Sequence, residues 1–194
     1  MATYLQVVEL HGVAELPPAT RALYDVRANT ATFSSGAALV ADETHLSVDL
    51  VAEGHHLSFE LVDEPAPGAL MARELALPAG EYLLRCDRVD FPPGGEAFLH
   101  THQGPGIRVL LFGSIRIETQ GATHEYGPGE PWFETGPDPV YAATHAGEPS
   151  AFVRCMVLPR ALQGSPSIRY VRDEDRERPK SQRYTVFLDE PVEL

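Results

Sequence analysis

Apolar and polar residues alternate in short runs along most of this 194-residue chain, and Gly or Pro separates the runs. Alternation with a period of two is typical of β-strands that bury one face, and closely spaced turns favour an antiparallel barrel or sandwich. The pattern predicts a succession of strands after residue 68. They cover residues 69–77, 81–91, 97–102, 107–112, 114–119, 122–126, 131–134, 140–144 and 152–158.

The pattern before residue 69 is mixed. Residues 17–34 open with two prolines, and Ala22, Leu23 and Val26 then follow at helical spacing, which predicts a helix. Residues 45–51 and 57–62 alternate as strands do.

Two adjacent histidines, His55 and His56, precede the second of these strands. Neighbouring residues of a strand face opposite sides, so we expect this pair to lie in a polar loop.

These patterns predict three parts: an N-terminal extension of helix and strands (1–69), a barrel (70–160) and a C-terminal arm (161–194). The arm contains a mixed-charge stretch and a late strand at 184–188. A lone strand needs a partner in the sheet or in a neighbouring subunit, so we expect a homodimer.

The composition excludes several classes of function. A net charge of −13 argues against binding to nucleic acid, which needs clustered Lys and Arg. No apolar run approaches the roughly 20 residues that cross a bilayer, and no signal-peptide pattern opens the chain, so we expect a cytoplasmic location without membrane contact. Cys86 and Cys155 lie in apolar runs and are expected to be buried free thiols.

The clearest chemical signal is His100-Thr101-His102, which follows Gly94 and precedes Gly113. On a strand, His100 and His102 point to the same side. Two imidazoles on one face of a strand form half of a metal site.

This segment resembles the first motif of the cupin superfamily, in which a Glu also binds the metal. Gly106 stands at the position of that Glu, and the weaker second motif, which opens at Gly129, has Val140 at the position of its His. The resemblance covers roughly residues 70–160 and implies an all-β, double-stranded β-helix (jelly-roll) barrel. It also implies a small molecule bound in the barrel and metal-dependent oxygenase, isomerase or lyase chemistry.

Three interpretations of the barrel remain open. In the first, His100 and His102 hold a divalent metal (Fe, Mn, Ni or Zn) weakly, and Glu134 is a better candidate than Gln103 or His145 for the third ligand. In the second, the pocket is free of metal. Arg108 then points inward to bind a carboxylate or phosphate, and Phe112 and Val140 complete the pocket. If a bulge at residues 104–106 shifts the register, Arg108 instead lies on the surface. In the third, the barrel serves assembly or interaction without catalysis.

Overall fold

Strands form nearly all of the regular structure. A computed structural model describes residues 2–12, 14–40 and 54–194, so the strand predicted at 45–51 lies outside the described residues. The chain divides into two compact units, an N-terminal unit (1–76) and a barrel unit (77–194).

The N-terminal unit is built on one antiparallel five-stranded sheet, with the strand order β3-β2-β4-β1-β5. Its strands are β1 (Tyr4–His11), β2 (Ala14–Asp25), β3 (Thr30–Val40), β4 (His55–Val62) and β5 (Met71–Glu74). His55 and His56 therefore open a strand, and the prediction of a polar loop is wrong.

The helix predicted at 17–34 is also wrong, because this segment forms β2, a tight turn and β3. The Asp25 carboxylate accepts hydrogen bonds from the backbone N–H groups of Arg27 and Ala28, and Asn29 adopts a φ of 54°. Asp and Asn stabilise turns in this way. Pairing of β2 with both β3 and β4 then outweighs the local helical spacing.

The two faces of this sheet differ in chemistry. Val7, Tyr24 and Phe59 are buried on the apolar face. On the other face, the buried Glu60 carboxylate accepts hydrogen bonds from Gln6 Nε2 and Ser58 Oγ, both at 2.7 Å. The same carboxylate lies 3.1 Å from Nε of the fully buried Arg21. A single carboxylate thus compensates a buried guanidinium on the polar face.

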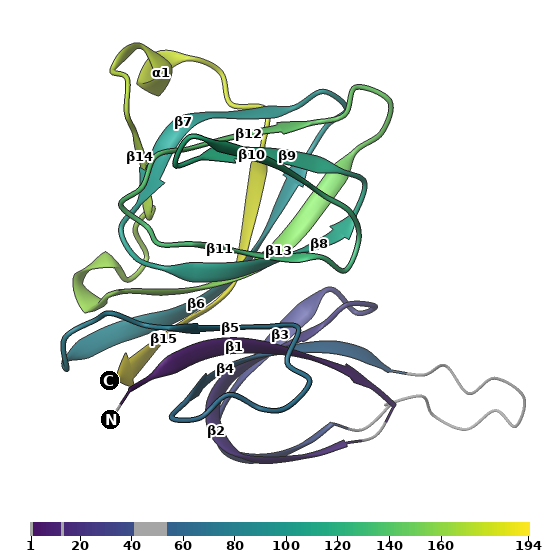
Figure 1. Cartoon of the computed structure of the whole chain (residues 1–194), viewed down its shortest axis with the longest axis vertical. Coiled ribbons are helices and arrows are strands. Elements are labelled where there is room, and N and C mark those ends of the chain that lie inside the picture. The colour runs from purple at the N-terminus through teal and green to yellow at the C-terminus, as the bar shows by residue number, and fades with distance from the viewer. Residues whose placement is uncertain (1, 13, 41–53) are drawn as a thin grey trace, which may run out of the picture. The chain divides into compact units, whose positions relative to one another are not determined.

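The barrel unit contains two five-stranded antiparallel sheets that lie opposite each other (Figure 1). One sheet has the order β11-β8-β13-β6-β15, and the other has the order β10-β9-β12-β7-β14. The strands are β6 (Glu81–Phe91), β7 (Glu96–His102), β8 (Gly106–Phe112), β9 (Ile115–Thr119), β10 (Ala122–Tyr126), β11 (Pro131–Glu134), β12 (Val140–Thr144), β13 (Ser150–Pro159), β14 (Ile168–Tyr170) and β15 (Arg183–Glu193).

Strands β6 to β13 have the connectivity of a jelly roll. The chain passes from β6 to β7 and then to β8 by changing sheets each time, and it returns from β12 to β13 in the same way. The resulting orders, β11-β8-β13-β6 and β10-β9-β12-β7, are those of two interlocked Greek keys. The all-β jelly-roll prediction is confirmed, and the predicted strand bounds lie within two residues of these eight strands.

The C-terminal residues extend both sheets. β14 pairs with β7, and β15 pairs with β6 over most of its length, so the late strand finds its partner within the chain. The short 3-10 helix η1 (Arg160–Leu162) lies between β13 and β14, and the four-residue helix α1 (Glu174–Glu177) lies between β14 and β15. Within the described residues, no helix has the length and apolar character needed to cross a membrane.

The interior between the two sheets has an apolar end and a polar end. Phe91, Leu110, Ile117, Trp132 and Phe152 belong to the main apolar cluster.

Cys86 and Cys155 are free thiols with no exposed surface, opposite each other on β6 and β13, which confirms the prediction that they are buried. Burial raises the pKa of both thiols, so they stay protonated.

We predict that Glu60→Gln lowers the free energy of unfolding by about 3–5 kcal/mol, because the charge of Arg21 stays buried without its carboxylate. Urea denaturation measures the change. Glu74→Gln is the matched control, since Glu74 is exposed in the same sheet. Equal midpoints for the two variants would show that the buried pair contributes little.

Candidate active-site pocket

His100 and His102 point into the barrel from β7, as the alternation of a strand requires, and are 5% and 4% exposed. His100 Nδ1 lies 2.7 Å from the Phe98 carbonyl oxygen, which places the Nδ1 proton in that hydrogen bond. His102 Nδ1 lies 3.3 Å from Ser167 Oγ, and its Nε2 lies 3.3 Å from Arg154 NH1. Because a guanidinium can only donate, His102 Nε2 is the acceptor and carries no proton.

Two arginines and two carboxylates face these histidines from the opposite sheet. Arg108 on β8 and Arg154 on β13 are direct cross-strand neighbours, and both are buried. Arg154 binds Asp87 on β6 through two hydrogen bonds of 2.6 and 3.1 Å, and Arg108 NH2 lies 2.7 Å from Glu134 Oε2. Like charges on adjacent strands repel each other, so each arginine needs its own carboxylate.

In the register of β11 against β8, Glu134 lies directly across from Gly106, the position at which the resemblance to the cupin motif would place a glutamate. A Cβ at Gly106 would come within 2.5 Å of the Cys155 carbonyl oxygen and 2.7 Å of Met156 Cγ. The backbone of β13 therefore leaves no room for a side chain at Gly106, and the carboxylate enters from the neighbouring strand.

The other two predicted pocket residues have different surroundings. Val140 is buried and pairs with His100 across β12 and β7, so it lies beside the imidazole inside the barrel. Phe112 is 39% exposed at the end of β8, where the Arg88 guanidinium lies 5.5 Å from its ring centre. Strict alternation from Arg108 would point Phe112 into the barrel. The register irregularity between β13 and β8 near Ala151 coincides with the exposed position of Phe112 instead. The substrate-binding roles of these residues stay predictions.

Burial and the two guanidinium groups lower the affinity of the histidines for protons. Desolvation lowers the pKa of His102 well below its ordinary value, and the charges of Arg154 and Arg108 lower it further. Desolvation also lowers the pKa of His100, against the opposing effect of Glu134. Burial lowers the pKa of Arg108 to about 10, so the guanidinium keeps its charge at neutral pH. The site thus presents two neutral imidazoles beside two cations.

This arrangement does not fit a metal centre. His102 Nε2 lies 3.6 Å from Glu134 Oε2, but Arg108 binds this carboxylate and Arg154 donates to the lone pair of His102 Nε2, so a cation would meet two positive charges there. Within the described residues, the group of three ligand atoms that lie within 4.8 Å of one another is in the N-terminal unit, and His100, His102 and Glu134 do not form such a group.

Two cavities of unequal size adjoin this polar network. The inner one lies between the sheets beside His100 and His102, and its volume of about 20 Å³ has room for the centre of about one water molecule. The outer one has a volume of about 480 Å³ and lies against β6, β15 and residues 164–168. Arg154 and Tyr184 line both cavities and so separate them.

Arg154, Asp87 and Tyr184 were not among the site residues predicted from the sequence. The available signal was a charged residue within an apolar strand, since Arg154 lies in Phe152-Val153-Arg154-Cys155, whereas Asp87 is one of several charged residues in its strand and carries no such signal. A charged residue in a strand with both faces buried usually has a buried partner. The identity of that partner depends on strand register, which the sequence does not specify.

Comparison with known proteins gives little further information. No protein-family model matches the chain, and no curated protein matches it. Among solved structures, it is similar to a mutant of salicylate 1,2-dioxygenase from Pseudoaminobacter salicylatoxidans, with a TM-score of 0.38 and 10% sequence identity. The match covers 79% of this chain and 66% of that one, so the chain spans just under two thirds of that protein's length. The description of the fold therefore rests on strand order alone.

We predict that the free energy of unfolding decreases as the pH is lowered, because of the two buried imidazoles. They stay neutral in the folded protein, whereas unfolded histidine takes up a proton near pH 6.5. The free energy of unfolding should fall as the pH drops below about 6.5, by about 1.4 kcal/mol per pH unit for each imidazole.

Guanidinium denaturation at pH 7.5 and 5.5 measures this loss, which should be smaller in His102→Gln. His124→Gln is the control, since His124 is exposed on β10, and should leave the wild-type difference unchanged. The same pH dependence in all three proteins would contradict the prediction.

We also predict that Gly106→Ala destabilises the barrel by about 1–3 kcal/mol, because the added methyl group overlaps the backbone of β13. Thermal unfolding followed by circular dichroism measures the change. Gly127→Ala is the control, since a Cβ there meets its nearest neighbour, Glu130, at an ordinary 3.6 Å. Wild-type stability in Gly106→Ala would mean that this position has room for a side chain.

Proposed function

We propose that the barrel unit is a cupin-type domain that binds a small organic carboxylate in the outer cavity, without a metal at His100 and His102. The cupin-type assignment is supported by the jelly-roll strand order together with the inward-facing His-x-His on β7. The observation that carries the binding proposal is Arg154, a buried guanidinium at the wall between the two cavities.

The size and lining of the outer cavity support a small ligand. Its volume of about 480 Å³ lies within the range of roughly 300–1,000 Å³ that is typical of ligand pockets. Ile168 and Val186 supply apolar surface, and Ser165, Ser167 and Tyr184 supply polar groups. This mixture favours a ligand with one polar end and an apolar body.

The walls of the cavity are held by paired charges. Arg85 binds Asp189 through two hydrogen bonds of 2.9 Å, and it also donates to the carbonyl oxygens of Leu162 and Ser165. These bonds tie the loop after η1 to β6 and β15. The loop is thus fixed before a ligand arrives, which lowers the entropic cost of binding.

A carboxylate is favoured because it would meet Arg154 at the inner wall. Arg154 uses Nε and NH2 to bind Asp87, and its NH1 donates to His102 Nε2. A ligand carboxylate would accept from NH1 more strongly than a neutral imidazole does, since a hydrogen bond between ions is stronger. His102 would then be released to bind the ligand or a water molecule.

The second candidate function is a divalent metal (Fe, Mn, Ni or Zn) at His100, His102 and Glu134 with oxygenase, isomerase or lyase chemistry. The hydrogen bond from His100 Nδ1 to Phe98 favours it, because metal-binding histidines usually donate their other N–H in this way. The ion pair of Arg108 with Glu134 weighs against it. Stoichiometric metal that disappears in His102→Ala would favour this second candidate.

We predict that Val186→Asp weakens benzoate binding by roughly tenfold, because it places a negative charge on the wall of the outer cavity without removing any ion pair. Calorimetric titration with benzoate tests this, and benzamide, which has a similar shape but no charge, should bind more weakly. Val171→Asp is the matched control, since both valines are about half exposed (54% and 49%) and Val171 does not line the cavity.

Two outcomes would contradict the proposal. Equal benzoate affinity in wild type, Val186→Asp and Val171→Asp would place the carboxylate outside this cavity. A lack of binding by acetate, succinate and benzoate would remove the support for an anion pocket.

A further inference from the structure

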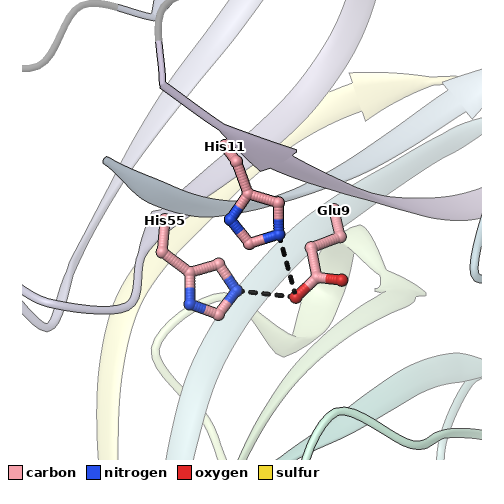
Figure 2. Close-up of side chains that lie close together, drawn as sticks. All are labelled: Glu9, His11 and His55. Atoms are coloured by element: carbon pink, nitrogen blue, oxygen red, sulfur yellow. Dashed lines mark hydrogen bonds and ion pairs between the residues drawn. The ribbon is translucent and has the colours of Figure 1, made fainter. Parts of the chain in front are cut away.

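Glu9, His11 and His55 form a second cluster of possible metal ligands, in the N-terminal unit (Figure 2). Glu9 and His11 are two residues apart on β1 and therefore share one face of the sheet. His55 opens β4 and pairs directly with His11 in the antiparallel register. Two paired strands thus bring three ligand side chains to one face. It is the face that buries Val7, two residues before Glu9 on the same strand.

Both imidazoles point at the same carboxylate oxygen. His55 Nε2 lies 2.8 Å from Glu9 Oε1, and His11 Nε2 lies 3.8 Å from it (Figure 2). The two rings are stacked, with centres 4.9 Å apart and planes 25° apart. Ligand atoms about 2.1 Å from a tetrahedral ion lie about 3.4 Å from one another, so the two measured distances bracket that value.

The cluster differs from the barrel histidines in its freedom from cations. Within the described residues, the ion pairs found for Glu9 are with His11 and His55, whereas Arg108 binds Glu134 in the barrel. Residues 1–76 also contain many more Asp and Glu than Arg, and no Lys. The local charge therefore favours a divalent cation rather than opposing one.

The cluster is also open to water. The side chains of His11, His55 and Glu9 are 56%, 39% and 32% exposed. A metal ion held by three protein ligands at such a place keeps an open coordination position that water fills.

We propose that Glu9, His11 and His55 bind one divalent transition-metal ion of the Zn²⁺ class. Imidazole and carboxylate are ligands that such ions accept, and a set of two His and one Glu suffices for zinc. Without an ion, His55 Nε2 lies within hydrogen-bond distance of the Glu9 carboxylate. To bind a cation through Nε2, each neutral imidazole takes the tautomer that carries its proton on Nδ1, so the two Nε2 lone pairs and one carboxylate lone pair are offered to the ion. The site lies in a different unit from the barrel network, so it does not depend on the function proposed for the barrel.

Calorimetric titration of the chelator-treated, full-length protein with Zn²⁺ tests the site. We expect one equivalent to bind in wild type, and His11→Ala to weaken this binding by at least roughly tenfold, because even the loss of a residue that only orients a ligand costs about 10–100-fold. Glu9→Gln should weaken it similarly. His124→Ala is the control, since it removes an exposed imidazole from the barrel unit.

Co²⁺ provides a second readout, because its visible spectrum reports tetrahedral nitrogen and oxygen ligands. The bands should appear with wild type and disappear with His55→Ala. Unfolding of each variant without metal checks that it is folded, and the exposure of His11 predicts little change there. Equal Zn²⁺ affinity in wild type and His11→Ala would show that the ion binds elsewhere. No Zn²⁺ binding by wild type would show that the cluster is an ion pair and not a metal site.

Discussion

The two guanidinium groups enclosed by the barrel impose the main constraint on this structure. Arg108 and Arg154 lie side by side on adjacent strands with almost no exposure to solvent. Such a pair is tolerated only if each charge is matched, and Glu134 and Asp87 provide the match. Breaking either pair would leave a buried charge without compensation. The polar end of the barrel therefore acts as one network rather than as independent residues.

The same network determines the chemistry available to His100 and His102. Burial keeps both imidazoles neutral, the charges of Arg154 and Arg108 act in the same direction, and Arg154 donates a hydrogen bond to the lone pair of His102 Nε2. The network adjoins an inner cavity that has room for about one water molecule and a much larger outer cavity. For this reason the proposed ligand site is the Arg154 wall rather than the centre of the barrel.

Identical residue types have different roles in the two units. In the barrel, His and Glu side chains are buried beside arginines, so a metal ion would meet positive charge and occupied lone pairs. At Glu9, His11 and His55 the same side chains are partly exposed, and within the part of the chain that the structure describes their ion pairs involve no arginine. The motif that resembles a metal site is therefore the poorer candidate, and an inconspicuous Glu-x-His on β1 is the better one.

The sequence by itself determined the barrel, because alternation, Gly and Pro are local signals that mark strands and turns. It also determined that His100 and His102 share a face, because side chains alternate along a strand, whereas the direction of Arg108 was left open. Only the tertiary structure decided the partners, since contacts between strands depend on register. Register placed Glu134 opposite Gly106, Arg154 beside Arg108, and His55 opposite His11. The helix expected at 17–34 failed for the same reason, because pairing with two neighbouring strands outweighed its local spacing.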